Sequence, residues 1–241
     1  MKHCNPLPPG DPRVGEAICY PRPPCGRDPW QLSSAGVEAF CDLPGGTAIP
    51  GGPRVIGKGH AGVVLAALTI WGPAAVKVLR LDSKRESLEW EARLQSEASR
   101  AGAAPRVYAW SDWFMVSELV EGPRLGDLRD PRGLPAGPVV ESLKAARALD
   151  AAGILHHEIH RPWENVILTG SAAVIVDYES AGRGCGNVAK ILSGLAAADP
   201  RLAALIPRVR GLLRSYKRSG CPRSLYEELE SIVAGALGKK G

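Results

Sequence analysis

One segment sets the architecture predicted for this chain: Ile56-Gly57-Lys58-Gly59-His60-Ala61-Gly62-Val63-Val64. Its glycines follow the pattern G-x-G-x-x-G-x-V, and the β-branched residues that follow predict a turn between two strands. Lys77 comes thirteen residues after Val64, in an expected strand over residues 74–79. Glycine allows the backbone to approach a phosphate closely, and a lysine on the next strand can neutralise its charge. The segment therefore predicts a loop that binds nucleotide phosphates.

The glycine pattern alone is a weak signal in a chain with 28 glycines. A dinucleotide-binding loop needs a helix directly after the glycines and an acidic residue about 20 residues further on. Here a second strand follows the glycines instead. The pattern thus favours a phosphate-binding hairpin over the dinucleotide fold.

Length and composition bound the class of protein. A chain of 241 residues suits one bilobal domain or two small ones. Hydrophobic residues make up 45% and charged residues 23%, as in ordinary globular proteins. No apolar run approaches the length of about 20 residues that spans a bilayer, and the first residues lack an apolar signal core. We therefore expect a cytoplasmic protein without a membrane partner. The net charge of +5 permits an acidic or RNA partner without establishing one.

The six cysteines contain no C-x-x-C pair. They are Cys4, Cys19, Cys25, Cys41, Cys185 and Cys221. We interpret most of them as buried or free thiols, and a disulfide or a metal site is the alternative.

The first fifth of the chain has no assignable chemistry. Residues 1–29 are rich in proline and glycine and predict an irregular arm. A short helix is expected over residues 30–35 and a strand over 37–41. The predicted domains are an N-terminal extension with short strands at 1–53, a sheet domain at 54–121 and a helical domain at 122–241.

An acidic residue stands out in the helix expected after Lys77. Ser83-Lys84-Arg85-Glu86 fits a capping box, which predicts a helix that begins at Ser83. The face with helical periodicity consists of Leu88, Glu91, Leu94 and Ala98. A carboxylate in an apolar stripe is costly unless a cation meets it, so we expect Glu91 to pair with Lys77. The alternative is that Glu91 lies at the edge of the stripe and reaches water. Glu89, on nearly the opposite side, is expected to be solvated.

Residues 107–110 and 113–118 predict a hairpin, and an extended connector follows to Gly122. Free backbone groups of this connector could meet the edge of an adenine; a plain linker is the alternative. The next helical face is formed by Val139, Leu143, Ala146 and Leu149, and we expect it in the centre of a helical domain.

A polar loop over residues 155–165 precedes two short strands, and the second strand delivers Asp177 at its end. Asn165 and Asp177 together suit oxygen ligation of Mg²⁺. Glu158 or His160 would then stand where a base meets an incoming hydroxyl group. The alternative for His156, His157 and His160 is a site of the zinc type.

The last 64 residues predict three amphipathic helices, near 187–197, 200–217 and 222–237. Basic side chains gather on the middle one: Arg208, Arg210, Arg214, Lys217 and Arg218. We interpret them as a solvated helix face, and a surface for RNA or an acidic partner is the alternative.

The motifs occur in the order of the protein kinase superfamily. They are Gly57-x-Gly59-x-x-Gly62-x-Val64, Ala75-Val76-Lys77, Glu91, the connector at 118–120, a histidine-rich loop and Asp177. More narrowly, the chain resembles the small archaeal predicted serine/threonine protein kinases. Three runs carry that match: Asp82-Ser83-Lys84-Arg85-Glu86-Ser87-Leu88-Glu89-Trp90-Glu91-Ala92, Glu158-Ile159-His160-Arg161-Pro162 and Val176-Asp177-Tyr178-Glu179-Ser180-Ala181. It is similar, more distantly, to RIO-type atypical kinases. The match covers roughly residues 54–195, with specific motifs in the first half and degenerate ones in the second.

The resemblance implies an α+β, bilobal protein-kinase-like fold. Its N-lobe would be an antiparallel sheet with one helix, and its C-lobe would be reduced and mostly helical. ATP would be bound by Ile56, Gly57, Lys58, Gly59, Gly62, Val64, Ala75, Lys77, Glu91, Glu118 and Val120. Lys77 would hold the α and β phosphates, and Ser117 would be the gatekeeper beside the adenine. Asp177 takes the place of the DFG aspartate and would bind Mg²⁺ with Asn165, although Tyr178-Glu179 replaces Phe-Gly.

The catalytic loop departs from the family pattern H-x-D-x-x-x-x-N. Counting five residues back from Asn165 gives His160, whereas aligning H-x-D gives His156-x-Glu158, seven residues before Asn165. We prefer Glu158 as the base because a carboxylate can accept the hydroxyl proton, and the position stays open between Glu158 and His160. The expected catalytic residues are Glu158, Lys77 and Asp177. An activation segment and the A-P-E motif are missing.

Three functions fit these motifs. The preferred one is an ATP- and Mg²⁺-dependent kinase that phosphorylates serine or threonine of a protein substrate. The second is a nucleotide-binding pseudokinase or weak ATPase in an RNA- or ribosome-related assembly. The third is a small-molecule kinase of the aminoglycoside-phosphotransferase type, for which 64 residues after Asp177 leave little room.

Overall fold

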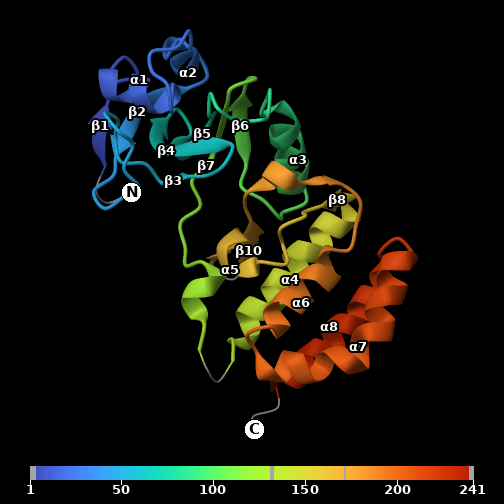
Figure 1. The fold of residues 1–241 in the computed structure, drawn as a ribbon. Coiled ribbons are helices and arrows are strands. Elements are labelled where there is room, and N and C mark those ends of the chain that lie inside the picture. The colour runs from blue at the N-terminus through green and yellow to red at the C-terminus, as the bar shows by residue number, and fades with distance from the viewer. Residues whose placement is uncertain (1–3, 131–132, 171, 239–241) are drawn as a thin grey trace. The chain divides into compact units, whose positions relative to one another are not determined.

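The computed structural model describes residues 4–130, 133–170 and 172–238 (Figure 1). The chain forms two compact units. Unit 1 consists of Met1–Arg93 and Arg106–Leu119, and unit 2 of Leu94–Pro105 and Val120–Gly241. Antiparallel sheets and helices together confirm the predicted α+β class. The domain boundaries at 53/54 and 121/122 stay predictions.

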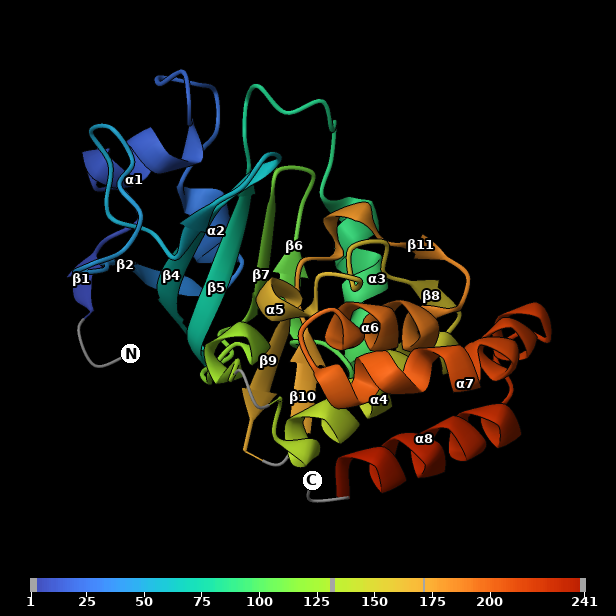
Figure 2. The same ribbon diagram turned by 60° about the horizontal axis from the view of Figure 1, so that its bottom comes forward.

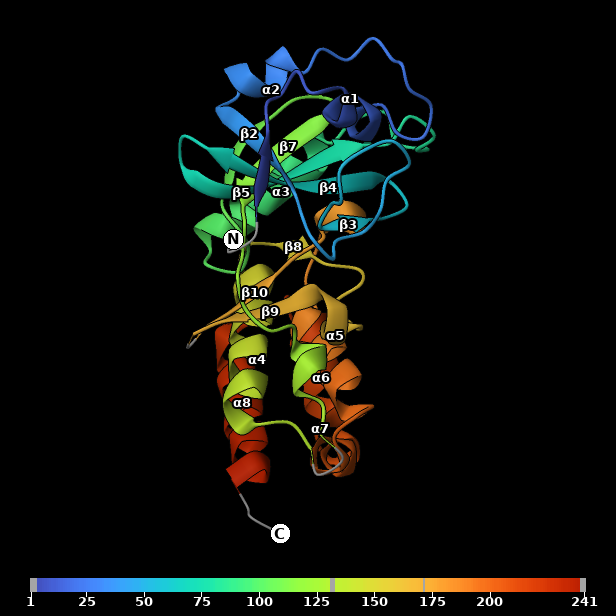
Figure 3. The same ribbon diagram turned by 90° about the vertical axis from the view of Figure 1, so that its left-hand side faces the viewer.

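Unit 1 is built on an antiparallel seven-stranded sheet (Figure 3). Its strands are β1 (Asn5–Leu7), β2 (Val37–Asp42), β3 (Gly57–Lys58), β4 (Gly62–Thr69), β5 (Gly72–Leu79), β6 (Val107–Trp110) and β7 (Phe114–Glu118). The order is β1-β2-β4-β5-β7-β6, and β3 pairs with β4. The strand at residues 37–41, the hairpin β6–β7 and the two strands around the glycine segment are therefore confirmed.

The two faces of this sheet differ because side chains alternate along each strand. One face is the core of unit 1: Val63, Leu65, Ala67, Ala74, Val76, Val78, Phe114 and Val116 are buried there. The alternate positions, which include Val64, Ala75 and Lys77, point to the opposite face. Cross-strand register places Val64 opposite Lys77 and Ala75 opposite Ser117.

The N-terminal segment is more regular than predicted. It contains β1, helix α1 (Pro12–Ile18) and helix α2 (Trp30–Ser34), of which only α2 was expected as a helix. Val14, Ala17 and Ile18 are buried in the core of unit 1. The prediction of an irregular arm over residues 1–29 is wrong here, because Pro12 occupies the first helical turn, where its missing N–H is not needed.

Helix α3 (Glu89–Arg100) begins six residues after the predicted serine cap. Ser83 Oγ accepts a hydrogen bond from the Arg85 N–H, which closes a local turn, and Ser87 Oγ accepts one from the Glu89 N–H. The capping box at Ser83 is therefore wrong. Serine side chains serve turns as well as helix starts, and the sequence contains two of them in this stretch.

Unit 2 is mostly helical, with short strands and 3₁₀ turns (Figure 2). Its elements, apart from the second half of α3, are η1 (Leu125–Leu128), α4 (Ala136–Ala151), β8 (Ile154–Leu155), α5 (Pro162–Asn165), β9 (Val166–Thr169), β10 (Ala172–Ile175), η2 (Tyr178–Ser180), β11 (Gly182–Arg183), α6 (Asn187–Ala196), α7 (Pro200–Arg218) and α8 (Arg223–Gly238). The four expected helices are confirmed as α4, α6, α7 and α8, and α4 packs against both α6 and α8. No helix of the described ranges combines the length and the apolarity needed to cross a bilayer.

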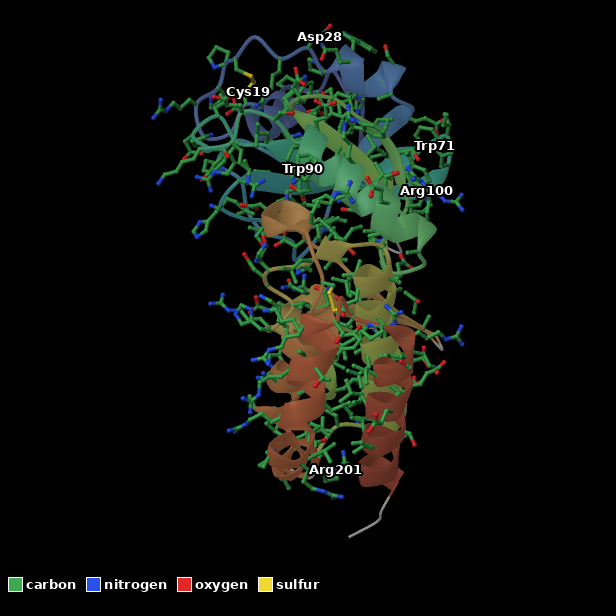
Figure 4. All side chains as sticks on the ribbon, turned by 90° about the vertical axis from the view of Figure 1, so that its right-hand side faces the viewer. Cys19, Asp28, Trp71, Trp90, Arg100 and Arg201 are labelled. Atoms are coloured by element: carbon green, nitrogen blue, oxygen red, sulfur yellow. A yellow bond between two sulfur atoms is a disulfide. The ribbon has the colours of Figure 1, made fainter. Side chains whose placement is uncertain are left out.

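All six cysteines form disulfides: Cys4–Cys41, Cys19–Cys25 and Cys185–Cys221. A yellow bond marks one of them beside the label of Cys19 in Figure 4. The preferred interpretation as buried or free thiols is therefore wrong. Their Cα atoms lie 4.9, 5.5 and 6.3 Å apart, within the range that a disulfide can bridge. Spacing along the chain gave no sign of this, because two of the pairs join residues more than 30 positions apart.

Candidate functional site

A buried ion pair lies on the open face of the unit 1 sheet. Lys77 Nζ is 2.6 Å from Glu91 Oε1, and the two side chains are 11% and 1% exposed. Lys77 lies on β5, and Glu91 lies in the first turn of α3. Glu89, two residues earlier, pairs with Arg93 at 2.5 Å near the surface. The predicted pairing of Lys77 with Glu91 is thus confirmed, and a carboxylate in this position is stabilised by the adjacent ammonium group.

The glycine segment lies against this lysine. A Cβ atom on Gly62 would come within 3.0 Å of Lys77 Cε and 3.1 Å of Lys77 Cγ. Gly57 has open space around it, and a Cβ on Gly59 would have only an ordinary contact. Gly62 is therefore the glycine whose missing side chain makes room for Lys77.

The remaining predicted residues of unit 1 surround this face. Val64 and Ala75 are partly buried, Ile56 is 36% exposed, and Lys58 is exposed. Ser117, opposite Ala75, is buried. Glu118 ends β7, but its N–H donates to the Arg106 carbonyl at 2.8 Å. That N–H is therefore already used within unit 1. Val120 is the first connector residue of unit 2.

In unit 2 the predicted metal ligands lie at the open end of the β9–β10 hairpin. The Val176 N–H donates to the Asn165 carbonyl at 2.9 Å, so Asp177 is one residue beyond the residue paired with Asn165. Asn165 is 6% exposed, whereas Asp177 is exposed. Asp177 has φ 67° and ψ 71°, a left-handed conformation that is uncommon for an aspartate. Residues in such backbone regions concentrate at functional sites.

Glu158 and Asn165 are joined directly. Asn165 Nδ2 donates to the Glu158 carbonyl at 3.2 Å, and the Arg161 N–H donates to the same carbonyl at 2.9 Å. Glu158 is partly buried, whereas His160 is exposed and its Nδ1 lies 3.1 Å from the His157 carbonyl. The loop geometry therefore couples Asn165 to Glu158 and leaves His160 in a local turn.

His156 is the buried centre of this loop. Its Nε2 lies 3.1 Å from the Val176 carbonyl, so the neutral ring donates there, and its backbone N–H donates to Asn187 Oδ1 at 2.8 Å. The Tyr178 ring meets it edge-on at 5.2 Å between centroids. Burial lowers the pKa of His156, and hydrogen bonding to Val176 and the charges of Asp177 and Glu158 only partly oppose this. His156 is therefore a neutral, structural ring that is hydrogen-bonded to Val176, the residue that precedes Asp177.

Two residues that hold this loop escaped the sequence analysis. Asp150, at the end of α4, accepts hydrogen bonds from the backbone N–H groups of Gly186, Asn187 and Val188, from Asn187 Nδ2 and from the Tyr216 hydroxyl. Asn187 Nδ2 also donates to the Ile154 carbonyl. The signal was present: Asp150 follows Leu143 by seven residues and Ala146 by four, so it is a carboxylate within an apolar helical stripe, as Glu91 is.

A zinc site of the three histidines is not formed. Among the described residues, the single group of three His, Cys, Asp or Glu side chains close enough to share an ion is Asp150 with Cys185 and Cys221. Those cysteines are bonded to each other, and the Asp150 carboxylate already accepts five hydrogen bonds. This group is therefore a structural cluster, because metal-binding cysteines must be thiolates.

The buried state of His156 predicts a pH dependence. The unfolded chain has the ordinary pKa near 6.5 and takes up the proton first, so stability should fall as pH drops below that value. Each unit of pKa difference is worth about 1.4 kcal/mol. In urea unfolding between pH 7.5 and 5, we expect His156→Gln to have a flatter pH profile than the wild type, since glutamine keeps an N–H donor. The exposed His160→Gln should keep the wild-type profile; equal slopes for all three proteins would contradict this role of His156.

A shallow groove of about 340 Å³ runs between α6 and α7 in unit 2. Its floor is apolar, with Ala189, Ile206 and Leu213. Its cations are Arg210, Arg214, Lys217 and Arg218, whereas Arg208 does not line it. Four of the five basic residues predicted on this helix thus share one surface.

Comparison with known proteins adds no relative. No family model matches the chain, and the search of curated proteins finds no match.

Proposed function

We propose that the chain is an ATP- and Mg²⁺-dependent phosphotransferase, and specifically an atypical serine/threonine protein kinase with the bilobal fold of that superfamily. The observation that carries the proposal is the buried Lys77–Glu91 pair behind a glycine that leaves room for it. A lysine fixed in this way presents one positive charge at a constant position, as binding of the α and β phosphates requires.

The loop of unit 2 supports the assignment of Glu158 rather than His160 as the base. Asn165 donates to the Glu158 carbonyl, so the two residues keep a constant separation despite the two extra positions between them. A partly buried carboxylate can accept the proton of a serine or threonine hydroxyl group. His160 is exposed and hydrogen-bonded within its own turn.

Asn165 and Asp177 fit the binding of Mg²⁺, which takes carboxylate, amide and phosphate oxygens. Because Asn165 Nδ2 donates to Glu158, its amide oxygen is the atom available as a ligand. Asp177 adds an exposed carboxylate, because it directly follows Val176, whose N–H donates to the Asn165 carbonyl. When bound, Mg²⁺ would neutralise charge on the transferred phosphate.

In the proposed reaction the chain positions and neutralises charged groups. Lys77 would hold the α and β phosphates, and Glu91 would hold Lys77 in place. The glycine segment, with Ile56, Lys58 and Val64, would cover the nucleotide, and Ala75, Glu118 and Val120 would contact the adenine. Glu158 would orient the acceptor hydroxyl and take its proton as the bond to phosphorus forms and the bond to ADP breaks.

The proposal is tested by incubation with γ-labelled ATP and Mg²⁺, with transfer measured to the chain itself and to a basic carrier protein. Lys77→Ala, Glu158→Gln and Asp177→Asn should each lower transfer by about a hundredfold or more. His160→Gln is the matched control and should keep wild-type transfer. Loss of transfer in His160→Gln with full transfer in Glu158→Gln would move the base to His160.

The second candidate is a pseudokinase or weak ATPase that binds RNA, and the groove of cations between α6 and α7 favours it. ATP binding through Lys77 without any transfer would support it. Because each phosphate contact releases counterions, Arg210→Gln/Arg214→Gln should reduce the slope of log affinity for RNA against log salt by about 2. Arg208→Gln, on the same helix but outside the groove, should leave the slope unchanged. Fluorescence anisotropy with labelled RNA, at about 50 to 300 mM salt, measures these slopes for the wild type and both variants.

We propose that the chain acts in the cytoplasm, because no apolar run of its sequence approaches the length of about 20 residues that spans a bilayer. Its three disulfides would persist there in an organism whose intracellular proteins keep disulfides, as those of hyperthermophilic archaea do. Alkylation of thiols in freshly lysed cells should then leave all six cysteines unmodified. Six alkylated cysteines would show that the thiols stay reduced in the cell and would contradict the persistence of these disulfides there.

A further inference from the structure

A small disulfide loop of the N-terminal segment is fastened to the end of β5. The Cys19–Cys25 bond encloses five residues that begin with Tyr20. The Leu81 N–H donates to the Tyr20 carbonyl at 3.0 Å. Arg27 Nη1 donates to the carbonyls of Ile18 and Leu79 at 2.7 and 2.5 Å. The segment is thus fastened to the end of β5 from within the disulfide loop, at Tyr20, and from just after it, at Arg27.

Two cations contact the Tyr20 ring. Lys58 Nζ and Arg80 Cζ are each 5.1 Å from the ring centroid. Lys58 Nζ also lies 3.3 Å from the Tyr20 hydroxyl oxygen. Both contacts are within the range of cation–π attraction. One of these cations, Lys58, belongs to the glycine segment itself.

The second cation carries the contact further into the glycine segment. Arg80 Nη1 donates to the Gly59 carbonyl at 2.9 Å, and the Arg80 N–H donates to the Ala61 carbonyl at 2.8 Å. Its Nε and Nη2 donate to the two carboxylate oxygens of Asp82 at 2.8 and 2.7 Å. The guanidinium group therefore contacts Tyr20, Gly59 and Asp82 together, and Tyr20 acts on the segment through both Lys58 and Arg80.

We infer that Tyr20, held by the Cys19–Cys25 loop, is a positioning residue that keeps the glycine segment Gly57–Gly62 in the conformation that binds nucleotide. A glycine-rich segment loses more backbone entropy when it becomes ordered than a segment of other residues does. A segment that is ordered in advance does not incur this cost when the ligand binds, so affinity rises. The inference rests on the proposed function, because it takes the ligand to be a nucleoside triphosphate.

Two variants of Tyr20 separate the ring from its hydroxyl group. Tyr20→Ala removes both cation contacts and should weaken binding of a fluorescent ATP analogue with Mg²⁺ by roughly fivefold to tenfold. Tyr20→Phe keeps the ring and should change affinity by about twofold at most. Without nucleotide, Tyr20→Ala should also raise the rate of amide hydrogen exchange in residues 57–62.

The disulfides of unit 1 provide a matched control. Cys19→Ser/Cys25→Ser should weaken nucleotide binding and speed exchange in residues 57–62, as Tyr20→Ala does. Cys4→Ser/Cys41→Ser removes a bond at the β1–β2 edge of the sheet. That bond joins residues 37 positions apart, whereas Cys19 and Cys25 are 6 positions apart. Its removal should therefore lower the melting temperature more and yet leave affinity and exchange of the glycine segment at wild-type values.

The two measurements distinguish the possible failures. If the wild type binds no nucleotide but Tyr20→Ala still speeds exchange in residues 57–62, the proposed function fails and the positioning role of Tyr20 stands. Unchanged exchange and unchanged affinity in Tyr20→Ala would overturn that role. Equal effects of the two disulfide variants on affinity would do so as well, since they would reveal a general loss of stability.

Discussion

Lys77→Met is expected to lower the free energy of unfolding of unit 1 by about 3–5 kcal/mol and to weaken nucleotide binding by roughly a hundredfold. The first effect arises because the variant lacks the ammonium group that lies 2.6 Å from Glu91, a carboxylate with 1% exposure. The second arises because methionine keeps the length of the side chain but presents no charge to a phosphate. Urea unfolding and titration with a fluorescent ATP analogue measure the two effects separately.

A second substitution separates stability from function. Lys77→Met/Glu91→Leu replaces the buried pair with apolar side chains and should recover most of the lost stability, because well-packed apolar residues often replace a buried pair without loss. It should not recover nucleotide affinity. Arg93→Met, which removes the exposed partner of Glu89, is the control and should change stability by less than about 1 kcal/mol. If the double variant bound nucleotide as tightly as the wild type, Lys77 would have no role in phosphate binding.

Removal of the Cys185–Cys221 bond by double serine substitution is expected to lower the free energy of unfolding of unit 2 by about 4 kcal/mol. The bond joins residues 36 positions apart, and loss of the cross-link gives the unfolded chain the entropy of that loop. The bond also lies beside Asp150, which holds the N-terminus of α6.

The other bridges set the scale for this effect. Cys4–Cys41 has a similar separation of 37 residues and should be worth about as much in unit 1, whereas Cys19–Cys25, with 6, should be worth about 2 kcal/mol. Urea unfolding of the three double-serine variants measures the order, and the wild type with a thiol reductant should lose stability in both units. If removal of the Cys19–Cys25 bond lowered the free energy of unfolding the most, the loop-entropy explanation would be wrong.

The sequence by itself determined most elements and one part of the candidate site. Hydrophobic periodicity located α4, α6, α7 and α8, because each buries one face against its neighbours. The Lys77–Glu91 pair was predictable because a buried carboxylate in an apolar stripe needs a cation, and Lys77 was the nearest candidate in the sequence. The same rule applied to Asp150 would have found the residue that holds α6.

Only the tertiary structure decided features that depend on distance between segments remote in the chain. Ser83 and Ser87 each accept a hydrogen bond from the N–H two residues further on, and only the structure shows that α3 begins after the second of them. The disulfide partners depend on Cα atoms that folding brings within 6.3 Å. The hydrogen bond from Asn165 Nδ2 to the Glu158 carbonyl is another such feature, because counting residues along the loop does not show which residues it brings together. Likewise, proline-rich composition concealed the role of Tyr20, because its contacts with Lys58 and Arg80 exist only after the N-terminal segment has packed on the sheet.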